Sequence, residues 1–132
     1  MKPTVAVDTN ILIRLLTRDD PDQAAKAMDL FQNHCCFIPK TVILETEWVL
    51  RFSYRFKRKD IGIALRKLMG MPVVVTEDQD AVVRALDWFI AGMDFADALH
   101  LASSRGVSAF ATFDRALADK AGQVQELPIE RL

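Results

Sequence analysis

The residues of this chain best suited to chemistry are carboxylates at the ends of apolar segments. Asp8 directly follows the apolar and β-branched run from Thr4 to Val7, and Asp114 follows a similar run from Ala109 to Ala111 through two intervening residues. In a parallel α/β sheet, the carboxyl ends of the strands face the crevice in which ligands bind. We therefore expect both side chains at one edge of the sheet.

Glu45 is the most unusual acid, because it begins an apolar stripe at helical spacing. Counted from Glu45, apolar residues stand three, four, seven and eleven positions on: Trp48, Val49, Phe52 and Phe56. The spacing predicts that Glu45 faces inward, whereas Glu47 lies roughly opposite and needs only solvent. A buried carboxylate is unfavourable unless it is paired, hydrogen-bonded or bound to a cation. With Thr41 as N-cap, Glu45 lies one position beyond the capping-box residue, so helix capping stays an alternative.

Asp97 is the fourth candidate, in the segment Asp94-Phe95-Ala96-Asp97 that opens an expected helix. It also has a structural explanation, because Asp94 can cap that helix and an acid in the first turn is favourable there. The same explanation applies at two other expected helix starts, where the capping candidates are Asp8, Thr9, Asn10 and Asp114.

The four acids together are more informative than any one of them. Asp8 and Asp114 each follow a parallel strand, whereas Glu45 and Asp97 lie in the first turns of helices. These helices abut the same edge of the sheet, so the four acids can converge. Carboxylates a few ångströms apart repel and resist ionisation unless a divalent cation neutralises them. Oxygen ligands suit hard ions, so the expected ion is Mg²⁺ or Mn²⁺. Its candidate ligands are Asp8, Glu45, Asp97 and Asp114.

The segments that must position these acids alternate between strands and helices. Short β-branched runs predict strands at Thr4 to Val7, Cys36 to Ile38, Val73 to Thr76, Ala109 to Ala111 and Gln125 to Leu127. Apolar residues three and four apart predict helices at Ile11 to Leu16, Pro21 to Phe31, Val42 to Phe56, Ile61 to Met69, Asp80 to Ile90 and Phe95 to Ser104. Glycines that can end helices are Gly70, Gly92, Gly106 and Gly122. The alternation predicts an α/β fold, a three-layer α/β/α sandwich with a short, mostly parallel sheet of four or five strands.

Length and composition fit one domain that spans residues 1–132. The chain can bury a hydrophobic core, because 51% of its residues are hydrophobic and it carries no Pro-, Ser- or Gly-rich tract. No apolar stretch approaches the roughly 20 residues that a membrane-spanning helix needs, and the start of the chain does not read as a signal peptide. We therefore expect a cytoplasmic protein, with Cys35 and Cys36 as buried strand thiols.

Although the net charge of the chain is −1, the segment between positions 51 and 67 is basic. This segment contains the single acid Asp60 and seven of the 17 basic residues: Arg51, Arg55, Lys57, Arg58, Lys59, Arg66 and Lys67. Such a local patch can bind a phosphate backbone even when the whole domain is not basic. A solvated helical surface is the alternative interpretation.

Taken in order and spacing, four stretches of the chain resemble the PIN domain family of metal-dependent ribonucleases, and most closely the VapC-type toxins of bacterial type II toxin–antitoxin pairs. The stretches are Val5-Ala6-Val7-Asp8-Thr9-Asn10, Ile38-Pro39 with Leu44-Glu45 and Trp48-Val49-Leu50, Asp94-Phe95-Ala96-Asp97-Ala98-Leu99, and Ala111-Thr112-Phe113-Asp114. The resemblance covers nearly the full length of the chain.

The resemblance implies that one or two Mg²⁺ or Mn²⁺ ions are held by three or four acids. The matching positions are Asp8, Glu45, Asp97 and, more variably within the family, Asp114. The resemblance favours Asp97 over Asp94 as a metal ligand. Asp94 would then cap the helix, or contact the ligand residues without binding the metal itself. Polar positions around the family's site match Thr9, Asn10 and Thr112, whose implied role is hydrogen bonding to carboxylates or to metal-bound water.

The resemblance also implies a reaction and partners. Hydrolysis through metal-activated water should leave a 5′-phosphate and a 3′-hydroxyl. The implied substrate is a structured RNA such as tRNA or rRNA, with a VapB-like antitoxin that blocks the site and a homodimer as the assembly. Contacts to the RNA backbone are expected from Arg14, Arg51, Arg55, Arg58 and Lys59.

Two other function classes compete with this interpretation. A Mg²⁺-dependent phosphatase with Asp8 as nucleophile also begins with an Asp after the first strand. Such an enzyme usually has a second Asp two residues on, where this chain has Asn10, and it leaves Glu45 unexplained. The other class is a non-catalytic RNA-binding or regulatory module whose acids only cap helices.

Overall fold

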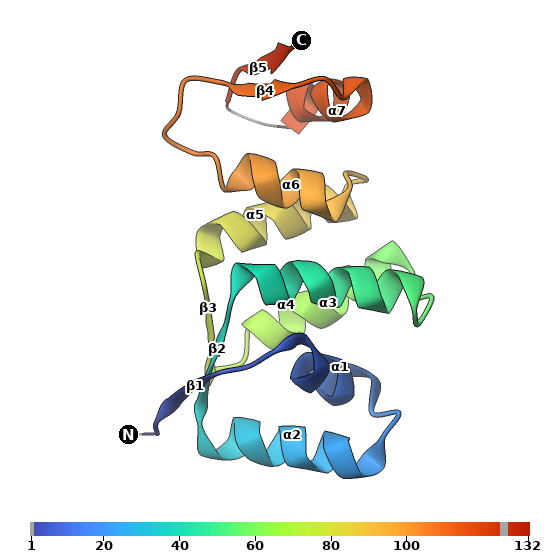
Figure 1. Ribbon diagram of the computed structural model, residues 1–132, viewed down its shortest axis with the longest axis vertical. Coiled ribbons are helices and arrows are strands. Elements are labelled where there is room, and N and C mark those ends of the chain that lie inside the picture. Colours follow the sequence, from blue (N-terminus) through green and yellow to red (C-terminus); the bar gives the residue numbers. More distant parts are fainter. Residues whose placement is uncertain (1, 125–126) are drawn as a thin grey trace. The chain divides into compact units, whose positions relative to one another are not determined.

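The computed structural model describes residues 2–124 and 127–132, and its contacts divide the chain into two compact units (Figure 1). The first unit comprises Met1–Gln79 and the second Asp80–Leu132. The prediction of one domain over residues 1–132 stays a prediction.

The first unit contains three strands and four helices. In chain order they are β1 (Thr4–Ala6), α1 (Thr9–Thr17), α2 (Pro21–Asn33), β2 (Cys35–Ile38), α3 (Lys40–Phe52), α4 (Arg58–Met69) and β3 (Val74–Thr76). The strands form a parallel sheet in the order β1-β2-β3, with Phe37 of β2 opposite Ala6 and Val75. Helix α1 packs against α2 and α3, and α3 also contacts α4 (Figure 1). The first unit therefore has a β-α-α-β-α-α-β organisation around a short parallel sheet.

Local side chains explain where these helices begin. Asp8 and Asp20 are the N-caps of α1 and α2, and each accepts a hydrogen bond from a backbone N–H three residues on. Pro21 then fills the first turn of α2, where its missing N–H leaves no donor unsatisfied. The buried core that these helices cover includes Leu12, Phe31, Ile38, Ile43, Leu50, Ile61 and Leu65.

The second unit contains three helices and two strands among the described residues. They are α5 (Gln79–Ile90), α6 (Phe95–Ala102), β4 (Phe110–Thr112), α7 (Arg115–Val124) and β5 (Ile129–Arg131), with α5 beginning one residue before the unit boundary. Strands β4 and β5 pair in parallel, with Thr112 opposite Arg131. Phe89 of α5 and Phe95 of α6 form an edge-to-face pair with ring centroids 5.5 Å apart, and both rings are buried. Aromatic contact thus holds the first two helices of this unit together.

The predicted α/β class with short parallel strands is confirmed. The five described strands are divided between a three-stranded and a two-stranded sheet. Four predicted strands and all the predicted helices are present, with shifts of a few residues at their ends; α3, for example, begins at Lys40 and ends at Phe52.

Three local predictions need correction. Gly122 lies inside α7 and does not end it. The last strand is Ile129–Arg131, not Gln125 to Leu127; of that predicted run, Gln125 and Glu126 lie outside the described residues and Leu127 is not in a strand. Cys36 is buried as expected, whereas Cys35 is only partly buried.

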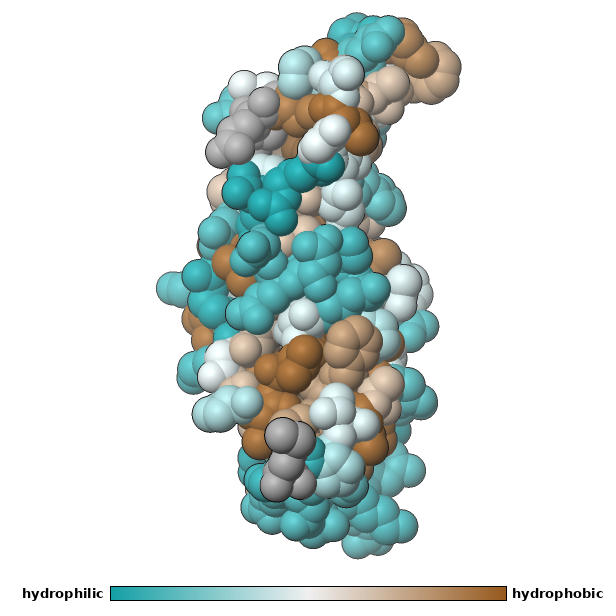
Figure 2. Space-filling view, turned by 90° about the vertical axis from the view of Figure 1, so that its left-hand side faces the viewer, coloured by the Kyte–Doolittle hydropathy of each residue, from teal (hydrophilic) through white to brown (hydrophobic). Residues whose placement is uncertain are grey.

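None of the helices in the described parts of the chain is both long enough and apolar enough to cross a membrane. The space-filling view shows hydrophilic side chains over most of the visible face and a smaller group of apolar ones at the surface of the first unit (Figure 2). Exposed apolar residues in that unit include Trp48, Phe52, Ile63 and Val75.

Candidate functional site

The first group of expected site residues lies where β1 leads into α1. Asp8 is exposed, and its Oδ1 accepts a hydrogen bond of 3.3 Å from the backbone N–H of Ile11. Thr9 is only 7% exposed, and its Oγ1 donates a hydrogen bond to Oε1 of Glu45. Asn10 is exposed in the first turn of α1. The fold therefore brings the Glu45 carboxylate into contact with Thr9, the residue next to Asp8.

The predicted orientation of α3 is wrong. Glu45 is exposed, and so are Trp48 and Phe52 of the proposed apolar stripe. The buried residues of α3 are Ile43, Thr46, Glu47 and Leu50. Apolar residues lie on both sides of this helix, and packing against α1 and α4 buries the side with Ile43 and Leu50. The N-cap is Pro39, without a side-chain cap, so Thr41 does not cap the helix and capping does not explain Glu45.

Glu47 is the buried acid of α3, and sequence reasoning placed it in solvent. It is 1% exposed, and its two carboxylate oxygens accept hydrogen bonds of 2.7 and 3.2 Å from Nε and Nη2 of Arg51. The spacing of four residues between Glu and Arg was the signal that could have identified this pair. Arg51, expected to bind RNA, therefore already neutralises a buried carboxylate.

The second group of expected site residues lies in the second unit. Asp94 is the N-cap of α6, where its Oδ2 accepts a 3.1 Å hydrogen bond from the backbone N–H of Asp97. Asp114 is exposed after β4, and its Oδ1 accepts a 3.1 Å hydrogen bond from the N–H of Leu117. Its own N–H donates to Oγ1 of Thr112 at 2.9 Å. Thr112 and Asp94 thus fix the backbone next to the two expected ligands of this unit.

Burial and two neighbouring acids shift the pKa of Asp97. Burial raises the pKa of its carboxyl group, and the negative charges of Asp94 and Asp114 raise it further, while His100 acts in the opposite direction. The two acids are therefore close enough to Asp97 to disfavour its ionisation. A partly buried acid whose charge is opposed by other acids is typical of functional sites, because a bound cation would favour the ionised form.

The chemistry of the donors fits a hard divalent ion. All four expected ligands offer carboxylate oxygens, which Mg²⁺ and Mn²⁺ prefer. Within residues 2–124 and 127–132, no three His, Cys, Asp or Glu side chains are grouped closely enough to hold a metal ion. The structure thus shows a Thr9–Glu45 contact beside Asp8 in the first unit and, in the second, the charges of Asp94 and Asp114 acting on Asp97.

The five expected RNA-binding residues all belong to the first unit, and they differ in their surroundings. Arg14 donates hydrogen bonds to Gln23, Asp19 and the hydroxyl of Tyr54 at 2.7, 3.0 and 3.2 Å. Arg55 and Lys59 are exposed, Arg51 and Arg58 are partly buried, and Arg55 adopts a left-handed backbone conformation with φ 59°. Arg55 and Lys59 are therefore the most accessible cations of the set.

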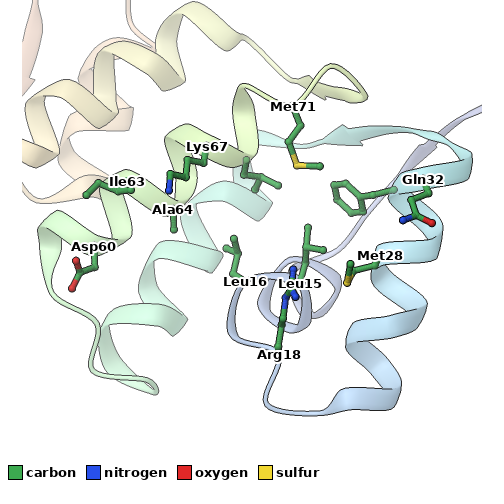
Figure 3. Close-up of a pocket in the computed structure, with 12 residues that line it drawn as sticks. Leu15, Leu16, Arg18, Met28, Gln32, Asp60, Ile63, Ala64, Lys67 and Met71 are labelled. Atoms are coloured by element: carbon green, nitrogen blue, oxygen red, sulfur yellow. The ribbon is translucent and has the colours of Figure 1, made fainter.

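An open groove of about 550 Å³ lies elsewhere in the first unit, between α1, α2 and α4 (Figure 3). Its lining is mainly apolar, with Leu15 and Leu16 from α1 and Met28 from α2, and Lys67 from α4 stands beside it. None of the expected site residues lines this groove. This groove and the expected acidic ligands Asp8 and Glu45 are thus separate features of the first unit.

Comparison with known proteins identifies the family. No curated protein matches the chain. A family model described as the PIN domain matches residues 5–123, which include all four acids and nearly every element described above. PIN domains are typically nucleases, they generally use divalent metal ions, and they act on nucleic acid. The chain belongs to the PIN domain family.

Proposed function

We propose that this chain is a Mg²⁺- or Mn²⁺-dependent endoribonuclease and the toxin of a VapBC-type pair. Its reaction would leave a 5′-phosphate and a 3′-hydroxyl, and its substrate in the cytoplasm would be tRNA or rRNA. The observation that carries the proposal is the hydrogen bond from buried Thr9 to Glu45, which holds an exposed carboxylate at the β1–α1 junction beside Asp8. Among the residues that the structure describes, neither a cap of α3 nor an ion pair explains that placement of Glu45.

The proposed metal ligands are Asp8, Glu45, Asp97 and Asp114. When bound, the ion would activate a water molecule and stabilise charge on the phosphate. The chain's own residues would position the ligands. Thr9 restricts the orientation of Glu45, Asp94 fixes the backbone N–H of Asp97, and Thr112 fixes that of Asp114. Asn10 is exposed next to Thr9 and is proposed to hydrogen-bond to metal-bound water.

The proposed partners follow the same resemblance. Arg14, Arg51, Arg55, Arg58 and Lys59 would contact the RNA backbone, a VapB-like antitoxin would block the site, and two copies of the chain would form a homodimer. Arg14 and Arg51 also make internal ion pairs with Asp19 and Glu47. Reversing the charges of exposed Arg55 and Lys59, together with that of Arg58, should weaken RNA binding and flatten its salt dependence.

The decisive experiment is cleavage of total RNA with Mn²⁺ or Mg²⁺, with and without EDTA. Wild type should cut and leave 5′-phosphate ends, whereas Asp8→Asn, Glu45→Gln and Asp97→Asn should lose activity. Asp22→Asn is the matched control, because Asp22 is an exposed acid in the first turn of α2 outside the proposed site. Cleavage that is indifferent to EDTA and to all three substitutions would contradict the proposal.

Calorimetry with Mn²⁺ separates an enzyme from a non-catalytic module. Saturable binding that Asp8→Asn and Asp97→Asn both weaken supports the metal site. If wild type shows no binding, the metal site is refuted, and Asp8, Asp94 and Asp114 keep only the capping role shown by their hydrogen bonds from Ile11, Asp97 and Leu117.

A further inference from the structure

Two large aromatic side chains stand on the exposed side of α3, and we call them the aromatic pair. Trp48 is 54% exposed and Phe52 is 52% exposed. Their ring centroids are 5.0 Å apart, with an interplanar angle of 46°. Glu45, Trp48 and Phe52 lie at positions i, i+3 and i+7, so they share one side of the helix. The aromatic pair therefore extends from the proposed metal ligand Glu45 toward the C-terminal end of α3.

The core of the first unit does not need the aromatic pair. The opposite side of α3 is already buried, through Ile43, Thr46, Glu47 and Leu50. Two adjacent aromatic rings that are half exposed form an apolar surface of the kind that marks a binding site. The structure thus leaves rings at the surface beside a carboxylate that is proposed to do chemistry.

The charges around the aromatic pair favour a polyanion as its partner. The guanidinium of Arg51 lies 4.6 Å from the ring centroid of Phe52. The chain then continues directly into the basic segment 51–67, where Arg55, Lys57 and Lys59 are exposed. Aromatic rings next to cations are the combination that binds single-stranded nucleic acid, because bases stack on the rings and phosphates bind the cations.

A second exposed ring flanks a proposed ligand in the second unit. Phe113 is 81% exposed, and it stands between Thr112 and Asp114. Each unit thus carries an aromatic side chain at the surface near an acid of the proposed site. The exposed ring of Phe113 lies outside the basic segment, and it agrees with base stacking as a way in which both units bind nucleic acid.

We propose that the aromatic pair is a stacking platform for unpaired nucleobases, so that the chain selects single-stranded or looped segments of RNA. The inference rests on the proposed ribonuclease function and adds a feature of the substrate to it. Base-paired RNA could not use the platform, because its bases are already stacked and their faces are covered. Trp48 and Phe52 would then hold bases beside Glu45 while the basic segment holds phosphates.

The test is RNA binding in EDTA, where no metal-dependent cleavage occurs. The protein carries Trp88→Phe, so that Trp48 is its only tryptophan and reports through its fluorescence. The probes are a mixed-sequence single-stranded RNA of about 12 nucleotides, in the range of single-strand binding sites, the same strand with abasic positions, and the duplex. The single strand should quench Trp48, and the abasic strand and the duplex should quench it far less.

Substitutions separate stacking from charge. Trp48→Leu should weaken binding of the single strand about tenfold or more, while Trp48→Phe keeps most of the affinity. The salt dependence should stay unchanged in Trp48→Leu, because the phosphate contacts remain. Phe52→Leu gives a second variant, and Ile90→Ala is the matched control, because Ile90 is an exposed apolar residue of the second unit.

Three outcomes overturn the inference: no quenching by the single strand, equal affinity of Trp48→Leu and wild type, or duplex binding as tight as single-strand binding. A Trp48→Leu variant that loses a dimer in solution but keeps its RNA affinity would also overturn it, since the aromatic pair would then be an interface between copies. The cleavage assay reports the proposed function separately. Stacking without cleavage refutes the nuclease and keeps the platform, whereas cleavage without stacking refutes only the platform.

Discussion

Thr9 Oγ1 donates a hydrogen bond to Oε1 of Glu45 and so joins the first turn of α1 to α3 across 36 positions of the sequence. The donor is buried and the acceptor residue is exposed, so the threonine fixes one end of a carboxylate that otherwise faces solvent. This contact connects the strand end that carries Asp8 with the helix that carries the aromatic pair.

Thr9→Val should therefore disturb the orientation of the Glu45 carboxylate while Glu45 itself stays in the chain. The valine keeps the shape of the threonine but removes the donor, so the free energy of unfolding in urea should fall by about 1 kcal/mol. Metal-dependent cleavage should fall as well, because Glu45 gains rotational freedom. Thr9→Ser is the control that keeps the hydroxyl, and it should retain more activity than Thr9→Val. Equal cleavage by wild type and Thr9→Val would show that the hydrogen bond does not position Glu45.

The Glu47–Arg51 pair predicts a large effect on stability. Arg51→Met leaves the buried carboxylate of Glu47 without a partner and should lower the free energy of unfolding by about 3–5 kcal/mol. Met at both positions should recover much of that loss, because no uncompensated charge remains. Arg55→Met is the control at an exposed arginine and should change stability by less than about 0.5 kcal/mol. If Arg51→Met unfolds like Arg55→Met in urea, the ion pair is not structural.

The raised pKa of Asp97 predicts that removing its charge stabilises the folded chain, and that this gain depends on pH. Its pKa is raised in the folded chain, so the folded state holds this proton more tightly than the unfolded state. Stability therefore falls as pH rises through the window between the unfolded and folded pKa values, and the loss persists at neutral pH. Asp97→Asn should raise the thermal midpoint at neutral pH in EDTA, and the gain should vanish below the ordinary aspartate pKa of about 3.9.

The matched control for Asp97→Asn is Asp119→Asn, at an exposed acid of α7 in the same unit. Differential scanning calorimetry of both variants across pH is the measurement. A thermal midpoint of Asp97→Asn at or below that of wild type at neutral pH would contradict the repulsion from Asp94 and Asp114.

The lowered pKa of Asp19 predicts the opposite pH dependence of stability. A 2.6 Å hydrogen bond from the Tyr54 hydroxyl lowers the pKa of its carboxyl group, with further help from Thr17 and the charge of Arg14. A lowered pKa contributes stability above the unfolded pKa, and this contribution disappears as pH falls through the folded value. Tyr54→Phe should therefore raise the pKa of Asp19, as measured by NMR titration, and lower stability more at neutral than at acidic pH.

Thr17→Val is the companion variant, because Thr17 Oγ1 donates to Asp19 at 2.9 Å but is the smaller of the two hydrogen-bond contributions. It should shift the pKa of Asp19 in the same direction by less. An unchanged pKa of Asp19 in Tyr54→Phe would show that the loop before α4 is not anchored to Asp19 in solution.

Signals carried by neighbouring residues were enough to predict most of the elements and the positions of Asp8, Asp94 and Asp97 at their starts. A strand followed by an acid and a helix is visible at Asp8, and a cap followed by a first-turn acid is visible at Asp94 and Asp97. These features depend on hydrogen bonds within a few positions of the chain, so the sequence contains both partners side by side. The α/β class follows from the same alternation of strands and helices.

The buried side of α3 and the partners of its charged residues were decided only by tertiary structure. Counting from Glu45 finds Trp48 and Phe52 at helical spacing, yet Ile43 and Leu50 make a second apolar side of the same helix. Periodicity cannot choose between two such sides, because burial depends on which one meets α1 and α4. The pairing of Glu45 with Thr9 likewise joins residues distant in the chain, and only folding brings them together.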